Sequence, residues 1–255
     1  MERFESFAAL HQQTTPLLLG NAWNVPSAKA FEAVEYAAIG LSSHAVAQAA
    51  GYDDGEQIPF EDVLKLAQRI VKAVNIPLSV DLEAGYSRHI DGIKEHIDRL
   101  CDAGVVGINL EDTLPGPQRI FQAPLEFART VDAIAGHLAR SHRKMFLNLR
   151  TDGFLLGLST ALHETLDRIK VYENAGAHGI FVPCITQPFD IKQVVQATPL
   201  PINVMCMPNL PSFDELAALG VRRISMGPYL FSKVYEHAGA LAQTVRKTQS
   251  FAAIV

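Results

Sequence analysis

Eight short apolar segments alternate with longer amphipathic segments along the chain, and this alternation restricts the fold more than any other feature of the sequence. Several apolar segments are rich in Val, Ile and Leu without strict alternation, which is typical of strands buried on both faces of a sheet. Repeated strand–helix units with parallel strands need right-handed crossovers, and about eight such units favour a closed barrel over an open sheet. The predicted strands span residues 17–21, 37–42, 77–83, 105–112, 145–152, 179–183, 201–207 and 221–227.

The segments between the predicted strands have the apolar spacing of amphipathic helices. Gly104, Gly176 and Gly220 lie just past predicted helix ends, where a left-handed cap is easiest for glycine. A short helix over residues 4–12 precedes the first strand and is expected to cover the N-terminal end of the barrel. The other predicted helices span residues 61–74, 92–103, 125–138, 162–175, 191–197 and 213–219.

No linker-like segment rich in Pro, Gly or Ser divides the 255 residues, and no GxGxxG motif follows the first predicted strand. The missing motif argues against an open sheet that binds a dinucleotide. We therefore predict an α/β protein with one (β/α)₈ TIM-barrel domain over residues 1–255, because such barrels commonly have this length.

Charge, cysteine content and the lengths of the apolar runs limit the expected partners and location of the protein. The net charge is −5 and the charges are scattered without a basic stripe, so nucleic acid is not an expected partner. Three cysteines lie far apart without a CxxC pair, which is typical of reduced thiols. The N-terminus lacks an apolar signal core, and no apolar run approaches the roughly 20 residues that cross a bilayer. We expect a soluble cytoplasmic protein without membrane partners.

Acidic side chains follow two neighbouring predicted strands, at the end where barrels of this type carry their sites. Asp81 and Glu83 are two residues apart and would point to the same side of a strand, and Glu111 ends the next strand. Asp54 lies in the loop after the second strand. A single acid at a strand end is commonly a helix cap or a surface group, but the whole set would repel itself without a cation. Oxygen ligands alone favour Mg²⁺ or Mn²⁺.

Other polar residues at strand ends are candidates for binding a small anionic substrate. Arg150 offers a planar fork for a carboxylate. Histidine side chains can transfer protons near neutral pH, which makes His44 a candidate acid–base residue, although a loop histidine bonded to backbone is an equal alternative. Trp23 is a candidate for lining the site, with packing near the end of the first strand as the simpler alternative. The predicted substrate-binding set is Ser42, Ser43, His44, Arg150, Asn203 and Trp23.

Several motifs together resemble the isocitrate lyase/phosphoenolpyruvate mutase superfamily over essentially the whole chain. They are LLLGNAWNVPSAKAFE at 17–32, AAGYDDGE at 49–56, VDLEAGY at 80–86, GINLED at 107–112, NLRTD at 148–152 and GVRRISMGP at 220–228. The resemblance implies a barrel whose last helix is often swapped between subunits, so we expect a homodimer or homotetramer.

The resemblance also implies roles for individual residues. Asp81 matches the direct Mg²⁺ ligand, Glu83 and Glu111 match acids that hold the water molecules of the metal, and Asp54 matches a further acid beside it. Arg150 matches the arginine that grips a substrate carboxylate. Ser42, Ser43 and His44 occupy the turn that binds the other anionic end of the substrate.

Five departures from the superfamily pattern narrow the range of expected activities. The segment 113–122 has no Lys-Lys/Arg-Cys-Gly-His motif, so cleavage of isocitrate or methylisocitrate is not expected. Thr113 replaces the lysine of phosphonopyruvate enzymes, and Pro183-Cys184 stands where those enzymes place a histidine, which argues against C–P bond chemistry. Glu83 replaces the more usual aspartate, and Asn24 stands where many relatives have aspartate.

The implied chemistry is cleavage of a carbon–carbon bond next to a metal-chelated 2-oxo group, which leaves an enolate. We predict a Mg²⁺-dependent lyase or decarboxylase, similar to oxaloacetate decarboxylase, that acts on a small 2-oxo acid or 2-hydroxy diacid. The expected catalytic residues are Arg150, His44 and Glu111. Tyr86 and Arg119 are further acid–base candidates, and decarboxylation demands less of a general acid than retro-aldol cleavage.

Two alternatives stay open. The first is phosphonopyruvate hydrolase or phosphoenolpyruvate phosphonomutase activity, and the second is a catalytically silent barrel that binds a metabolite. Cys184 and Cys206 are interpreted as small buried residues rather than nucleophiles.

Overall fold

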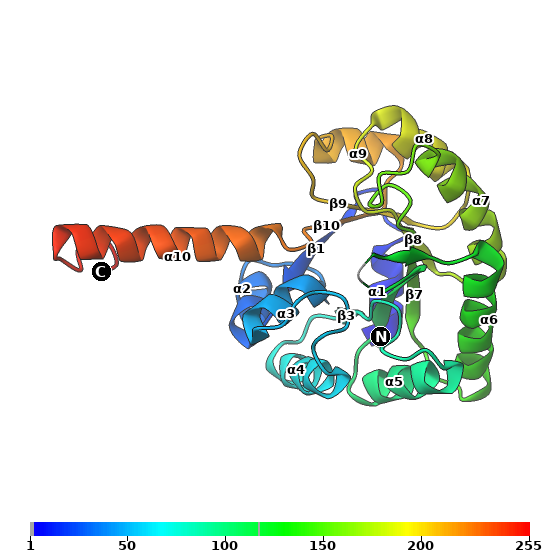
Figure 1. The fold of residues 1–255 in the computed structure, drawn as a ribbon, viewed down its shortest axis with the longest axis horizontal. Helices are drawn as coiled ribbons and strands as arrows, with labels where there is room; N and C mark the ends of the chain where they lie inside the picture. Colours follow the sequence, from blue (N-terminus) through cyan, green and yellow to red (C-terminus); the bar gives the residue numbers. More distant parts are fainter. Residues whose placement is uncertain (1–2, 117) are drawn as a thin grey trace.

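The computed structural model describes residues 3–116 and 118–255, and its main feature is a closed parallel barrel ringed by helices (Figure 1). The hydrogen-bonded order of the strands is β1-β10-β9-β8-β7-β4-β3-β2. Each barrel strand overlaps one of the eight predicted segments, which confirms the barrel prediction. The barrel strands are β1 Leu17–Ala22, β2 Ile39–Leu41, β3 Leu78–Asp81, β4 Gly107–Glu111, β7 Phe146–Arg150, β8 Gly179–Phe181, β9 Ile202–Met205 and β10 Arg223–Ser225.

Most helices lie where the apolar spacing places them, within a few residues at each end. Gly104, Gly176 and Gly220 have φ angles of 86°, 106° and 94°, as predicted for glycines that follow helix ends. The helices are α1 Arg3–Leu10, α2 Val25–Ala33, α3 Ser43–Ala50, α4 Phe60–Ala73, α5 Ile90–Asp102, α6 Pro124–Arg140, α7 Ala161–Asn174, α8 Pro188–Gln196, α9 Phe213–Leu219 and α10 Tyr229–Thr248.

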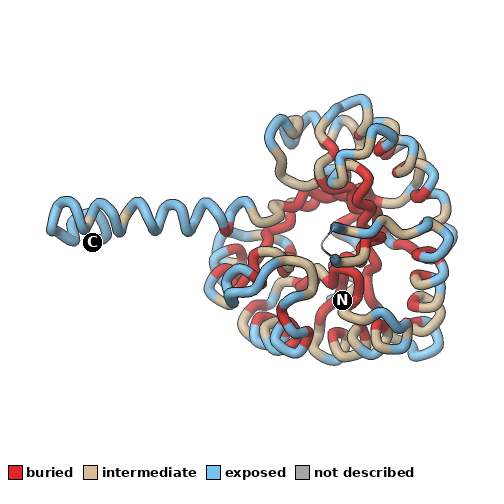
Figure 2. Tube along the Cα trace, in the orientation of Figure 1, coloured by how far each residue is buried: buried red, intermediate tan, exposed pale blue. Residues whose placement is uncertain are grey.

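Four features of the fold lie outside the helices and strands predicted from the spacing, and the first of them is helix α2, between β1 and β2. Helix α3 follows the second strand directly, where the sequence analysis expects only the turn of Ser42, Ser43 and His44. The segment 113–122 contains a small antiparallel hairpin, formed by β5 Thr113–Leu114 and β6 Ile120–Phe121. Helix α10 projects away from the barrel and is exposed over most of its length (Figures 1 and 2). No helix in the described part of the chain is long and apolar enough to cross a bilayer.

The hydrophobic core lies between the barrel wall and the surrounding helices, where Figure 2 shows the buried trace concentrated. The inside of the barrel carries a hydrogen-bonded set of amide side chains. The amide of Asn148 donates to Asn109 Oδ1 at 2.8 Å and to Asn203 Oδ1 at 3.2 Å, and Asn203 Nδ2 donates to Ser225 Oγ at 3.1 Å. The inside of the barrel is therefore a polar floor beneath the strand ends.

Helix α1 covers the N-terminal end of the barrel, as predicted. Its Phe7 is fully buried and packs in a second apolar cluster with side chains from the beginnings of several strands. The other buried members of this cluster are Leu17, Leu19, Ala38, Val106 and Phe146.

His11, just after α1, is buried against the barrel and should make the fold sensitive to acid. His11 is 2% exposed, and its Nδ1 lies 2.8 Å from the carbonyl oxygen of Phe7. Its ring stacks on that of Phe146, with the ring centroids 4.2 Å apart. Burial, aided by the positive charge of Arg223, lowers the pKa of His11 to about 3. His11 therefore binds a proton near pH 6.5 in the unfolded chain but only near pH 3 in the folded chain. The free energy of unfolding consequently falls as the pH decreases from 6.5 towards 3.

The variant His11→Phe keeps a stacked ring and cannot be protonated. Wild-type protein is expected to lose about 2 kcal/mol more than this variant between pH 7 and pH 4.5, as the linkage relation gives for such a shift. Urea unfolding at both pH values measures the difference, and the exposed His163→Phe serves as the control. An equal pH dependence in wild type and His11→Phe would contradict the assignment.

Candidate active site

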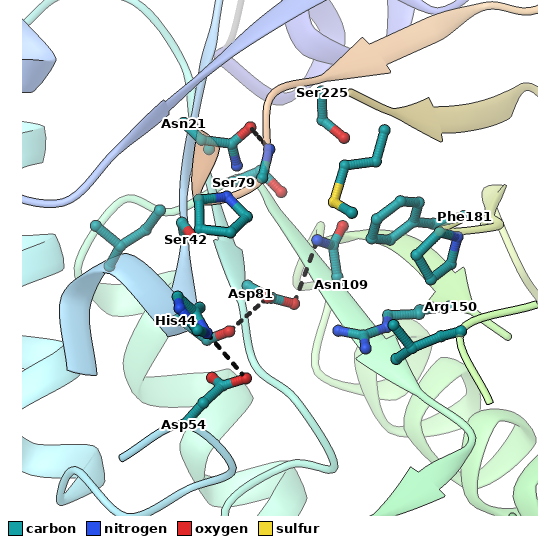
Figure 3. Close-up of a pocket in the computed structure, with 18 of the residues that line it drawn as sticks. Asn21, Ser42, His44, Asp54, Ser79, Asp81, Asn109, Arg150, Phe181 and Ser225 are labelled. Carbon is teal, nitrogen blue, oxygen red and sulfur yellow. Dashed lines mark hydrogen bonds and ion pairs between the residues drawn. The ribbon is translucent and has the colours of Figure 1, made fainter. Parts of the chain in front are cut away.

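A cavity of about 330 Å³ opens at the C-terminal ends of the strands, and all eight barrel strands contribute to it (Figure 3). This volume is near the lower limit for sites that take small molecules. One side of the lining is apolar, with Leu155, Leu156, Phe181, Pro183 and Met205. The polar side includes Asn21, Ser42, Ser43, His44, Asp54, Ser79, Asp81, Asn109, Arg119, Arg150, Arg223 and Ser225.

Asp81 ends β3 and presents its carboxylate to the cavity (Figure 3). Ser43 Oγ donates to Asp81 Oδ2 at 2.7 Å, and Asn109 Nδ2 donates to Asp81 Oδ1 at 3.3 Å. Asp54 lines the cavity from the loop after α3, and its Oδ2 lies 3.4 Å from His44 Nδ1. Asp54 and Asp81 therefore line the same cavity, as expected for an acid that reaches in from the loop after the second strand.

Glu83 lies behind Asp81 rather than in the cavity lining. Its Oε2 accepts a hydrogen bond from the backbone N–H of Glu56 at 3.0 Å, and its Oε1 accepts one from the hydroxyl of Tyr86 at 3.0 Å. The longer arm of glutamate allows this reach to the loop at residue 56. Burial, together with the charges of Asp81, Asp54 and Glu111, raises the pKa of Glu83 to about 8.

Glu111 ends β4 and is likewise buried behind the cavity, 1% exposed. Its Oε2 lies 2.9 Å from Arg150 Nη1, its Oε1 forms an ion pair with Arg119, and Thr113 Oγ1 donates to it at 3.1 Å. Burial raises the pKa of Glu111 to about 7, although the charges of Arg150 and Arg119 oppose this rise. Glu111 is therefore placed to hold two arginines rather than to touch a ligand.

Arg150 lines the cavity, but its guanidinium is already engaged by two acids. Besides the contact with Glu111, Nε donates to Asp152 Oδ1 at 2.6 Å and Nη2 donates to Asp152 Oδ2 at 3.1 Å. Asp152 is fully buried, and it was missing from our predicted site. Its position two residues after Arg150 on the same strand end was the available signal.

Arg119 reaches the site from the hairpin of β5 and β6 and lines the cavity. It contacts three acids: Glu111 in an ion pair, Asp54 at 3.5 Å and Asp152 at 3.6 Å. The hairpin therefore closes one side of the cavity with a neutralised arginine.

The predicted acids do not form a compact metal cluster. In the two described stretches of chain, no group of three or more His, Cys, Asp or Glu residues is arranged to hold a metal ion by direct contacts. The donor set still fits an ion held directly by one carboxylate and otherwise through water, as Mg²⁺ prefers. Asp54 Oδ1 is buried without a hydrogen-bond partner, and the mutual repulsion of the four acids contributes to the raised pKa of Glu83.

The remaining predicted residues divide between the cavity and its surroundings. Ser42 caps α3, and its Oγ accepts from the N–H of Ala45 at 3.4 Å, so the N-terminus of α3 faces the cavity with Ser42, Ser43 and His44. Asn203 is 1% exposed and lies beneath the cavity lining, in the amide set of the barrel interior.

Trp23 lies outside this cavity. It lines an apolar groove between α2 and α10 and packs edge-on against Phe231 at 5.4 Å, which fits the packing alternative. Asn24 caps α2 by accepting from the N–H of Ser27 at 2.8 Å. Cys184 and Cys206 are free thiols, and burial raises the pKa of both.

Comparison with known proteins places this barrel among related ones. The profile of the phosphoenolpyruvate phosphomutase family matches residues 7–246. A Mycobacterium tuberculosis protein of uncharacterised function is 32% identical over 94% of this chain and 88% of its own length. The oxaloacetate decarboxylase of Pseudomonas entomophila is 28% identical over 67% of this chain and 59% of its own. A solved structure from Burkholderia cenocepacia, provisionally named a phosphonomutase, has 36% identity and a TM-score of 0.90 over 95% of this chain and 100% of its own.

Proposed function

The chain belongs to the phosphoenolpyruvate phosphomutase family, and we propose that it is a Mg²⁺-dependent enzyme that breaks a carbon–carbon bond in a small 2-oxo acid. The observation that carries this proposal is the combination of Asp81 and Asp54 with two anion-attracting groups around one small cavity. Those groups are Arg150 and the N-terminus of α3, whose first N–H groups have no acceptor within the helix. The similarity to an oxaloacetate decarboxylase supports the same chemistry.

The acids of the site would hold Mg²⁺ or Mn²⁺ unequally. Asp81 faces the cavity and would bind the ion directly, and Asp54, which also lines the cavity, would reach it through water. Glu83 and Glu111 lie behind this lining and would add negative charge to the site. The bound cation would supply Lewis-acid stabilisation for the negative charge that develops on the 2-oxo oxygen when the neighbouring bond breaks.

The residues of the chain then have separable tasks. Arg150 would orient the substrate carboxylate, since its fork is held in place by Asp152 and Glu111. The apolar wall around Phe181 and Met205 would exclude water and so strengthen these charged contacts. Glu111 is a positioning residue in this scheme.

Loss of CO₂ from a four-carbon 2-oxo diacid leaves the enolate of pyruvate, which needs one proton at carbon 3. His44 lines the cavity and contacts Asp54, and it is our candidate for delivering that proton. Retro-aldol cleavage would additionally need a base for the substrate hydroxyl. Both oxygens of Glu83 accept hydrogen bonds from the protein, and Glu111 forms ion pairs with Arg150 and Arg119, so decarboxylation suits the site better.

Pyruvate release from about twenty 2-oxo and 2-hydroxy diacids, with and without Mg²⁺, tests the proposal. We expect Mg²⁺-dependent pyruvate formation from an oxaloacetate-like substrate. Phosphate release from phosphonopyruvate would instead support C–P bond chemistry. Mg²⁺-dependent oxalate binding without any turnover would indicate a silent metabolite-binding barrel. Either of these results would overturn the proposed reaction.

The expected association into dimers or tetramers stays a proposal. Helix α10 leaves apolar side chains exposed beside the groove that holds Trp23, which is where a second copy of the chain would bury them. The exposed apolar residues of this helix are Tyr229, Leu230, Val234 and Tyr235.

A further inference from the structure

We propose that Arg223 binds an anion at the floor of the cavity, and that this anion is the second carboxylate of the substrate. The inference rests on the proposed function for the substrate class. It adds a binding residue that lies below the strand ends, inside the barrel. The site would therefore select dianionic over monoanionic acids.

The buried guanidinium of Arg223 has no negatively charged partner among the described residues. Arg223 begins β10, is 1% exposed and contributes to the cavity lining. Its Nη2 donates to Asn109 Oδ1 at 3.3 Å, while Nε and Nη1 are buried without a hydrogen-bond partner. Over residues 3–116 and 118–255, no acid forms an ion pair with it. A buried charge in this state is unfavourable until an anion arrives.

The other two arginines of the cavity differ from Arg223 in this respect. Arg150 is held by Glu111 and Asp152, and Arg119 contacts three acids. Each of these two arginines therefore has acidic partners in the protein, which Arg223 lacks. Burial lowers the pKa of Arg223 to about 9, and the charge of Asp81 opposes that shift, so Arg223 is still positive at pH 7. Arg223, at the floor of the cavity, is therefore the arginine of the lining that has no acidic partner among the described residues.

The position of Arg223 sets the length of the ligand. Asn109 connects the two ends of the site, since its Nδ2 donates to Asp81 Oδ1 and its Oδ1 accepts from Arg223 Nη2, each at 3.3 Å. A ligand with its 2-oxo or 2-hydroxy acid end at Asp81 would thus place a second carboxylate a few bonds away, near Arg223. Ser79 also lines the cavity and offers a hydroxyl donor, whereas the hydroxyl of Ser225 already donates to the carbonyl oxygen of Val204 at 3.3 Å. A four-carbon diacid has this form.

Two ligands that differ only in the second carboxylate test the inference. Calorimetry with Mg²⁺ compares malate with lactate on wild type, Arg223→Met and Arg223→Lys, with oxalate as the probe of the Asp81 end. We expect wild type to prefer malate. Arg223→Met should bind malate about 10- to 100-fold more weakly, as loss of a charged hydrogen bond predicts, and change lactate and oxalate less than about threefold. Arg223→Lys should recover part of the malate affinity.

A thermal melt of Arg223→Met in buffer without chloride separates binding from folding. The wild-type arginine is buried and unpaired, so we expect the methionine variant to melt at the same temperature or higher. A lower melting temperature together with an equal loss of malate, lactate and oxalate binding would assign Arg223 a structural role and overturn the inference.

Other outcomes also overturn it. These are no preference for malate in wild type, an unchanged preference in Arg223→Met, and chloride binding that depends on Arg223 without any malate preference. Failure of the proposed reaction is a different result, because pyruvate would then be released from no substrate while the malate preference and its loss in Arg223→Met persist.

Discussion

The variant Asp81→Asn is expected to lose Mg²⁺-dependent oxalate binding by at least about 100-fold, since it removes the one carboxylate proposed to touch the ion. Asparagine has the size of aspartate and lacks its charge. Its oxygen can still accept from Ser43 or Asn109, which now donate to Asp81 at 2.7 and 3.3 Å. The fold should therefore survive, and the loss should be specific to the cation.

Calorimetric titration of oxalate in the presence and absence of Mg²⁺ measures this effect. Asp132→Asn, on the exposed side of α6, is the matched control and should bind as wild type does. Asp54→Asn should lose about tenfold, because an acid that holds the ion through water contributes less than a direct ligand. Unchanged Mg²⁺-dependent oxalate binding in Asp81→Asn would show that the cation site lies elsewhere.

The barrel was predictable because its elements follow local patterns of apolar residues. The strands are short apolar runs, and most helices have amphipathic spacing. Helix α3 was missed because Ser42, Ser43 and His44 are polar residues at a strand end, and we interpreted them as a loop. The hairpin at 113–122 was missed for a different reason. Its strands have two residues each, Thr113–Leu114 and Ile120–Phe121, which is too short for any periodicity. Pro117, between them, lies outside the described residues.

The site was predictable to the extent that function follows from position at a strand end. Asp81 and Arg150 were found in this way, and both line the cavity. The pairing of acids with arginines was not predictable, because Arg119 comes to Glu111 through the hairpin rather than through a strand. Arg223 was overlooked because it stands inside a segment that otherwise indicates an ordinary buried strand. Only the register of β10 in the closed barrel shows that its side chain points inward to the cavity.

Behind the site, Asp112 and Arg168 form a buried ion pair on which the hairpin depends. Asp112 Oδ2 lies 3.2 Å from Arg168 Nη1 and accepts from the Tyr172 hydroxyl at 2.7 Å. Arg168 Nη2 also donates to the carbonyl oxygen of Gln122 at 2.9 Å, and its guanidinium lies 3.4 Å from the ring centroid of Phe121. The pair thus fixes the end of the hairpin that brings Arg119 to the cavity.

The variant Arg168→Met should lower the free energy of unfolding by about 3–5 kcal/mol, the usual cost of removing one partner of a buried ion pair. Asp112 is fully buried and would lose its cationic partner. Burial already raises the pKa of Asp112 to about 6, against the opposing effects of Tyr172 and Arg168. Removal of Arg168 raises this pKa further. The folded variant then binds a proton that the unfolded chain releases, so the loss of stability is larger at pH 8 than at pH 5.

Urea unfolding of Arg168→Met, Asp112→Asn and the double variant at both pH values separates the charge effect from lost packing. The double variant has no uncompensated charge, so it should regain at least half of the stability that Arg168→Met loses, and its free energy of unfolding should change less between pH 5 and pH 8 than that of Arg168→Met. Arg69→Met on the exposed face of α4 is the control, with an expected change below about 0.5 kcal/mol. If the double variant were as unstable as the sum of the single variants, Asp112 and Arg168 would be acting independently. The ion pair would then not be what holds the hairpin over the cavity.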